Sequence, residues 1–173
     1  LEMLRYENKT GTKIGLLVDN VPYWQVVADL ICPSSNEASV GKDAFIYQRI
    51  IPYSGDGSVI LPVWKGPKGT IKFGILNNFR HSIRNFVLEL PRGHQTEGLS
   101  SEENSNKEIC EELKVSRDQI TGVLPLGKVM PDSGLTASEV SLFAAEIIGE
   151  APPTGNIGHE GIKELLWVDI ETL

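Results

Sequence analysis

The stretch that decides the fold is GHQTEGLSSEENSNKEICEELKV, residues 93–115, and its centre is the run KEICEE. Glu111 and Glu112 follow Glu108 by three and four residues, so on an α-helix the three side chains share one face. Carboxylates gathered in this way repel one another unless a positive charge lies between them. A hard divalent cation such as Mg²⁺ prefers such oxygen ligands. The run therefore predicts metal-assisted attack on a phosphate ester or anhydride; the alternative is a solvated acidic helix face.

Ser100 and Glu103 predict where this helix begins. A serine followed three residues later by a glutamate is a capping-box pair, in which each side chain accepts the backbone N–H of the other residue. The helix is therefore expected to begin near Ser101. Its apolar face is small, because Ile109 and Leu113 form a single pair.

The segment resembles the Nudix box, a family motif with the pattern G-x5-E-x7-R-E-U-x-E-E-x-G-U, in which U is apolar. The residues that match at the right spacing are Gly93, Glu108, Ile109, Glu111, Glu112 and Val115. Three positions depart from the pattern: Leu99 replaces the first glutamate, Lys107 the arginine and Lys114 the late glycine. The three glutamates that bind the catalytic metals in the family are all present.

The flanking segments extend the resemblance to the ADP-ribose pyrophosphatase branch of that family. This branch typically has a QFR-like triplet and then ELPAG before the box; here NFR at 78–80 and ELPRG at 89–93 take those places. A proline commonly lies sixteen residues beyond the box, and Pro131 lies sixteen residues after Val115. The resemblance covers residues 23–173, which is most of the chain.

The resemblance implies an α/β Nudix fold, a mixed β-sheet sandwiched by helices, preceded by an N-terminal β extension. We expect residues 1–43 to form this extension, a candidate dimerisation arm, and residues 44–173 to form the Nudix domain. The family's second helix is expected to be missing, because only residues 171–173 follow the last predicted strand. Residues 1–20 fit either a hairpin or a loosely held arm.

Runs of β-branched and aromatic residues bounded by turn signals predict the strands. The expected ranges are 23–32, 44–51, 58–65, 70–78, 85–90, 120–130, 138–148 and 164–170. Between two of them, Gly66-Pro67-Lys68-Gly69 is favoured as a plain hairpin turn over a phosphate cradle, because neither a helix nor a P-loop lysine follows it.

The resemblance also implies roles for individual residues. The expected ligands of Mg²⁺ or Mn²⁺ are Glu108, Glu111, Glu112 and the backbone carbonyl of Arg92. Glu108 is counted as catalytic as well. Glu160, in the glycine-rich loop GHEG, is the candidate base for the attacking water. An ordinary surface glutamate is the alternative for Glu160, and His159 is a rival base.

Two residues are candidate substrate contacts. Arg80 offers a guanidinium for bidentate contacts with phosphate, and the alternative is a salt bridge to Glu89. Trp24 falls where relatives place an aromatic residue that stacks on adenine, sometimes across a dimer; core packing is the alternative. His81 and His94 are expected to be polar loop residues.

Composition limits the partners. The 173 residues carry a net charge of −7, which argues against a broad surface for nucleic acid or anionic membranes. Phosphate-bearing small molecules stay compatible, because a bound metal inverts the local charge. Cys32 and Cys110 are too few for a disulfide framework. Since the sequence shows neither a membrane-spanning apolar run nor a signal-peptide pattern, a cytoplasmic location is expected.

Two functions from different classes follow. The first is a Mg²⁺-dependent hydrolase of a nucleoside diphosphate derivative, with ADP-ribose or a nucleotide sugar as leading substrate, acting as a homodimer. The second is a catalytically weak or inactive Nudix domain that binds such a nucleotide as a sensor or partner module. Leu99 and Lys114 favour the second function, whereas the intact run KEICEE and Pro131 favour the first.

Overall fold

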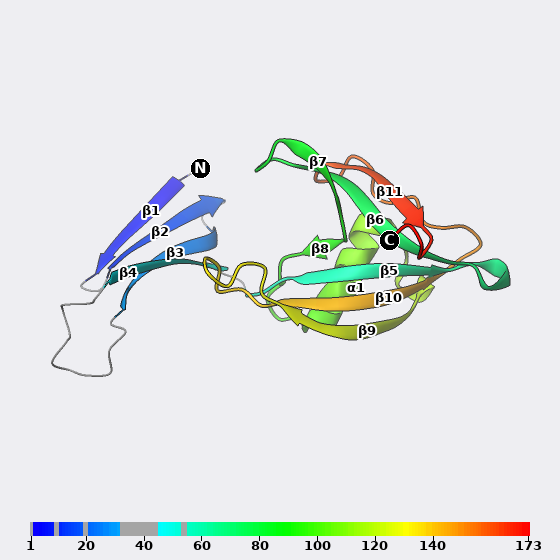
Figure 1. Cartoon of the computed structure of the whole chain (residues 1–173), viewed down its shortest axis with the longest axis horizontal. Coiled ribbons are helices and arrows are strands. Elements are labelled where there is room, and N and C mark those ends of the chain that lie inside the picture. Colours follow the sequence, from blue (N-terminus) through cyan, green and yellow to red (C-terminus); the bar gives the residue numbers. More distant parts are fainter. Residues whose placement is uncertain (1, 9–10, 19–20, 32–44, 53–54) are drawn as a thin grey trace. The chain divides into compact units, whose positions relative to one another are not determined.

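A computed structural model of the chain describes residues 2–8, 11–18, 21–31, 45–52 and 55–173 (Figure 1). The chain divides into two compact units. The N-terminal unit consists of Leu1–Gly55 and Met130–Glu139, and the C-terminal unit of Asp56–Val129 and Val140–Leu173.

The N-terminal unit contains a four-stranded sheet of order β1-β2-β3-β4, in which all neighbours are antiparallel. Its strands are β1 (Glu2–Asn8), β2 (Gly11–Val18), β3 (Val21–Ile31) and β4 (Phe45–Pro52). Of the two forms expected for the first residues, β1 and β2 therefore adopt the hairpin. The predicted boundary between residues 43 and 44 lies outside the described residues, and β4 groups with the strands before it.

The C-terminal unit contains a seven-stranded sheet of order β11-β6-β5-β10-β9, with β7 paired to β6 and β8 paired to β5. Its strands are β5 (Ser58–Lys65), β6 (Ile71–Arg80), β7 (Asn85–Glu89), β8 (Arg92–Gly93), β9 (Ile120–Val129), β10 (Val140–Ile148) and β11 (Ile162–Val168). The pair β10–β5 is parallel and the other pairs are antiparallel. The sheet is therefore mixed, as predicted.

The helix α1 (Ser101–Leu113) begins where its capping box predicts. The Ser100 hydroxyl accepts from the Glu103 N–H at 3.2 Å, and the Ser100 N–H donates to Glu103 Oε2 at 2.8 Å. After the helix, Lys114 has φ 55°, the left-handed conformation that glycine usually supplies at this position. The chain thus keeps the helix ending of the Nudix pattern without its glycine, at a cost of about 1 kcal/mol in backbone strain.

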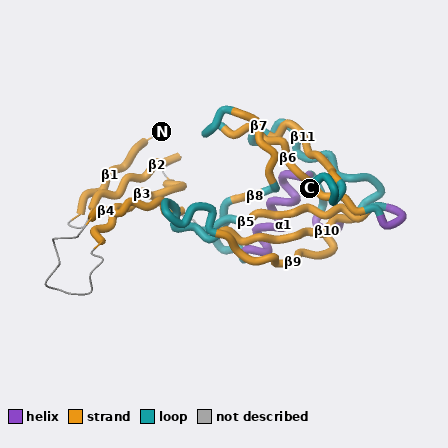
Figure 2. The backbone as a smooth tube through the Cα atoms, viewed as in Figure 1, coloured by secondary structure: helices purple, strands orange, loops and turns teal. Residues whose placement is uncertain are grey.

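The core of the C-terminal unit lies between α1 and one face of its sheet (Figure 2). Along β5 and β10 every second residue is buried, as expected when one face of a sheet packs against a helix. The buried residues of this core are Ile60, Trp64, Ile109, Leu113, Val115, Ile120, Phe143, Ala145 and Ile147. The helix contributes Ile109 and Leu113, both fully buried, which confirms the small apolar face predicted for it.

Two short 3₁₀ helices complete the described structure, η2 (Pro67–Gly69) in the β5–β6 turn and η3 (Arg117–Gln119) before β9. After β11, residues 169–173 form a turn closed by a 3.0 Å hydrogen bond from the Thr172 N–H to the Asp169 carbonyl. No helix in the described ranges is long and apolar enough to cross a membrane.

Candidate active site

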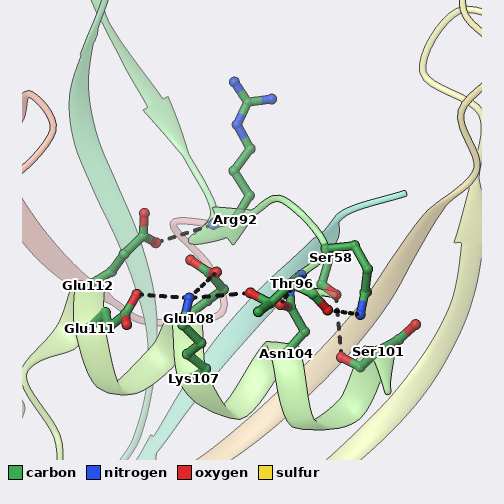
Figure 3. Close-up of polar contacts among 10 residues, drawn as sticks. Ser58, Arg92, Thr96, Ser101, Asn104, Lys107, Glu108, Glu111 and Glu112 are labelled. Atoms are coloured by element: carbon green, nitrogen blue, oxygen red, sulfur yellow. Dashed lines mark hydrogen bonds and ion pairs between the residues drawn. The ribbon is translucent and has the colours of Figure 1, made fainter. Parts of the chain in front are cut away.

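The three glutamates of KEICEE lie on the C-terminal half of α1, beside β8 (Figure 3). Glu112 is 7% exposed, and the side chain of Glu108 is 12% exposed, whereas that of Glu111 is 50% exposed. The helix therefore carries two of its carboxylates into the protein rather than leaving all three in solvent. Burying a charged group without a partner is unfavourable, so these two carboxylates need compensation.

The electrostatics of Glu112 and Glu108 show that this compensation is incomplete. The pKa of Glu112 is raised to about 8, mainly by burial and next by the charge of Glu108, while the Arg92 N–H opposes the rise. That N–H donates to Glu112 Oε2 at 3.2 Å. Burial also raises the pKa of Glu108, against the opposing charge of Lys107. A cation bound between the two carboxylates would favour their ionised forms.

Lys107 places a positive charge among the glutamates, although the family pattern has arginine there. Its ammonium lies 3.8 Å from Glu108 Oε1 and 3.6 Å from Glu111 Oε2. Charge-assisted hydrogen bonds are shorter, about 2.7–2.9 Å. Lys107 therefore forms an ion pair with both carboxylates, at distances longer than a charge-assisted hydrogen bond, and neutralises the cluster only in part.

Arg92 and Gly93 form the short strand β8, which lies outside the strand ranges expected from the sequence. β8 pairs with the start of β5 at Ser58 and Val59, and this long-range pairing has no local sequence signal. A Cβ atom at Gly93 would lie 1.9 Å from the carboxyl carbon of Glu108, so any other residue here would displace this carboxyl group. The metal-ligand role predicted for the Arg92 carbonyl stays a prediction.

The loop that carries Glu160 is anchored to α1 and to β6. The Asn156 N–H donates to the Glu112 carbonyl at 2.7 Å, and the Phe79 N–H donates to the Gly161 carbonyl at 3.0 Å. Glu160 itself has φ 46°, a conformation that non-glycine residues adopt mainly where the surroundings impose it. Its charge raises the pKa of both Glu108 and Glu112. The loop thus brings the predicted base to the buried glutamates.

Arg80 forms the salt bridge that was the alternative to its predicted phosphate contact. Its Nε donates to Glu89 Oε2 at 2.9 Å, and a second guanidinium nitrogen donates to Oε1 of the same carboxylate. Asn78 Nδ2 also donates to Glu89 Oε1, at 2.8 Å. Glu89 was not predicted as a site residue, yet its charge raises the pKa of Glu112. The position of Glu89 in the ELPRG segment is the sequence feature from which a role at the site could have been predicted.

Trp24, His81 and Cys110 each have different surroundings. Trp24 belongs to β3 of the N-terminal unit and is 36% exposed, and its stacking role stays a prediction. The ring of His81 packs edge-to-face on Phe79, with 5.6 Å between centroids. Cys110 is a free, partly buried thiol, and Cys32 lies outside the described residues.

Within the described ranges, no three His, Cys, Asp or Glu side chains converge into a ready-made metal site. The donor chemistry nevertheless fits a hard divalent cation. Glu108 and Glu112 are buried carboxylates with raised pKa values, and the carboxyl group of Glu108 lies directly against the backbone of Gly93. Glu108 and Glu112 would hold such an ion, and Glu111 extends the same helix face toward solvent.

No protein-family model matches the chain, and no curated protein matches it. Among solved structures, a NUDIX hydrolase from Listeria monocytogenes str. 4b F2365 aligns with a TM-score of 0.52 and 17% identity, over 68% of this chain and 79% of that chain. A Nudix hydrolase from M. smegmatis, RenU, aligns with a TM-score of 0.48 and 14% identity, over 66% and 70% of the two chains. The first similarity shows that the chain has the mixed α/β fold of Nudix hydrolases.

The raised pKa of Glu112 makes the stability of the metal-free protein depend on pH. The pKa is about 8 in the folded state against an ordinary value of 4.5, so the folded state keeps a proton that the unfolded state has already lost between these values. This contribution is fully present below pH 4.5 and is lost as the pH rises through 8. In EDTA, we expect the free energy of unfolding to fall by about 3 kcal/mol between pH 5 and pH 8.

Urea unfolding at both pH values measures this change. Glu112→Gln should remove most of the pH dependence, whereas the half-exposed Glu111→Gln, as matched control, should keep it. If the free energy of unfolding changed equally between the two pH values in the native chain and in Glu112→Gln, Glu112 would not keep its proton in the folded state.

Proposed function

We propose that this chain hydrolyses the pyrophosphate bond of a nucleoside diphosphate derivative with the help of a divalent cation, Mg²⁺ or Mn²⁺. The observation that carries the proposal is the pair of buried carboxylates, Glu108 and Glu112, whose pKa values are raised beside β8 in a Nudix fold. A carboxyl group whose pKa is strongly raised by burial and by a neighbouring charge, as that of Glu112 is, marks a candidate functional site.

Each residue of the site has a part in this chemistry. Glu108 and Glu112 would hold the cation, with Glu111 and the Arg92 carbonyl as further candidate ligands. When bound, the cation would polarise the diphosphate and lower the pKa of a water molecule. The N–H of Arg92 orients the Glu112 carboxylate. Glu160 would accept the proton of the attacking water, because its loop holds it near the same carboxylates.

ADP-ribose is the substrate that the sequence supports best, with nucleotide sugars next. The support comes from the NFR and ELPRG segments and from Pro131, which resemble the ADP-ribose pyrophosphatase branch. Within these segments, Arg80 forms a bidentate pair with Glu89, and its contact with phosphate stays a prediction. The homodimer, adenine stacking by Trp24 and the cytoplasmic location stay predictions.

The alternative function is nucleotide binding without turnover, as in a sensor module. Leu99 favours it, because this position of the Nudix pattern lacks its carboxylate. Lys107 is a weaker point in its favour, since an ammonium lacks the planar fork of a guanidinium yet still lies among the glutamates.

A panel of nucleoside diphosphate derivatives tests the proposed function and separates it from the alternative. With Mg²⁺, we expect ADP-ribose to be converted to AMP and ribose 5-phosphate, and EDTA to abolish the conversion. Release of monophosphate can be followed chromatographically, with Glu112→Gln as the matched inactive variant. Tight binding of one compound without turnover of any would favour the sensor.

A further inference from the structure

Thr96 is fixed on several sides in the loop that precedes α1 (Figure 3). Its backbone N–H donates to Asn104 Oδ1 at 3.0 Å. Its carbonyl accepts from the Leu99 N–H and from Gln95 Nε2, both at 3.2 Å. Gln95 Nε2 also donates to the Leu99 carbonyl at 2.6 Å, which ties the same turn together. The backbone of Thr96, from which the hydroxyl projects, is thereby held at a defined place before the helix.

Asn104, on α1, anchors the backbone of Thr96 to the helix. It is fully buried, and its Nδ2 has no hydrogen-bond partner among the described residues. An unpaired buried amide destabilises a fold, so packing alone would be served better by a small apolar residue here. The contact that Asn104 does make, with the Thr96 N–H, is therefore the feature that accounts for an amide at this position.

Lys107 lies one helical turn beyond Asn104, on the same side of α1. Its ammonium is 3.4 Å from Thr96 Oγ1, 3.8 Å from Glu108 Oε1 and 3.6 Å from Glu111 Oε2. The ammonium thus lies between the Thr96 hydroxyl and the two carboxylates, slightly nearer to the hydroxyl. A lysine without this partner is free to close onto a carboxylate to about 2.7–2.9 Å, the length of a charge-assisted hydrogen bond.

We propose that Thr96, anchored by Asn104, is a positioning residue that holds the Lys107 ammonium away from Glu108 and Glu111, so that their oxygens stay available to a divalent cation. The inference rests on the proposed function in one respect, that these carboxylates bind such a cation. In this arrangement, Lys107 reduces the repulsion among the glutamates without competing for the oxygens that the cation needs. The polar contacts at Thr96 and Asn104 supply a loop anchor close to Leu99, where the Nudix pattern has a carboxylate.

The test is a Mn²⁺ titration of the full chain without substrate, followed by electron paramagnetic resonance. Thr96→Val keeps the side-chain shape and the three backbone contacts but removes the hydroxyl. We expect the Kd for Mn²⁺ to rise about five- to tenfold, because the freed ammonium competes for the carboxylates. Thr96→Ser should restore the native Kd. Thr70→Val, which removes the hydroxyl that donates to the Pro67 carbonyl at 3.0 Å in the β5–β6 turn, is the matched control and should leave the Kd unchanged.

Lys107→Met distinguishes positioning from a structural effect. If Thr96 acts through the ammonium, Thr96→Val adds nothing to the Kd once Lys107 has become Met. A loss of affinity that persists in the Lys107→Met background overturns the inference, as does an unchanged Kd in Thr96→Val or a native chain that binds no Mn²⁺. Turnover is measured separately: Mn²⁺ binding that follows the expected pattern without hydrolysis of any diphosphate would refute the proposed function and leave the positioning role standing.

Discussion

Glu112→Gln is expected to lower kcat at saturating Mg²⁺ by about two orders of magnitude or more. The carboxylate of Glu112 is buried next to that of Glu108, and the Arg92 N–H fixes its orientation. Glutamine has nearly the same shape and can still accept that N–H, but it has no charge with which to hold a cation. The loss should therefore appear in the chemical step and in metal affinity, while the protein stays folded.

Leu99→Ala is the comparison for this variant. Leu99 is partly buried, and the loop around it is held by backbone contacts, such as its carbonyl with Gln95 Nε2. We expect this substitution to lower the melting temperature more than it changes kcat per folded molecule. Thermal melts of both variants accompany the kinetics. Near-normal kcat in Glu112→Gln would show that the metal assignment is wrong for this chain.

The features that the sequence predicts well are set by neighbours along the chain. The start of α1 follows from Ser100 and Glu103, which are three residues apart, and the observed helix begins at Ser101. The strand β5 coincides with its predicted range, because its alternating apolar residues are bounded by turn residues. Helical spacing likewise places Glu108, Glu111 and Glu112 together without knowledge of the fold.

The features that the sequence does not predict depend on long-range contacts. The strand β8 exists because Arg92 and Gly93 reach the start of β5, more than thirty residues earlier in the chain. The Asn156 N–H that anchors the Glu160 loop bonds a carbonyl of α1 which the helix itself leaves unpaired. Nothing in the local sequence of either segment specifies these partners.

The three departures from the Nudix pattern have different structural consequences. Lys114 adopts the left-handed conformation of the missing glycine. Lys107 supplies a positive charge in place of the missing arginine, 3.8 Å from the Glu108 carboxylate and 3.6 Å from that of Glu111. Leu99 supplies no charge, and the polar contacts nearby come from Thr96 and Asn104 instead. Compared position by position, the chain departs from the pattern three times. The structure nevertheless keeps the helix ending at Lys114 and a positively charged side chain at Lys107.

Glu160→Gln is expected to lower kcat by about 100-fold or more, the usual contribution of a general base. Glu160 is exposed, yet its loop is tied to the carbonyl of Glu112 and to β6, so its carboxylate stays near the buried glutamates. Glutamine occupies the same backbone position, φ 46°, with a similar side chain, so the loop should keep its form. Only the capacity to accept a proton is lost, and for this reason KM for the diphosphate should change far less than kcat.

His159→Gln is the matched control, because His159 precedes Glu160 in the same loop and is the rival base. Its kcat should stay near that of the native chain, and the Mn²⁺ affinity measured without substrate should stay close to native in both variants. A large loss in His159→Gln with a small loss in Glu160→Gln would transfer the role of the base to the imidazole. A weakened Mn²⁺ affinity in Glu160→Gln would instead make Glu160 a metal ligand, since a base that acts only on water has no direct bond to the ion. Turnover and metal affinity together thus decide which of the two chemical roles the anchored loop performs.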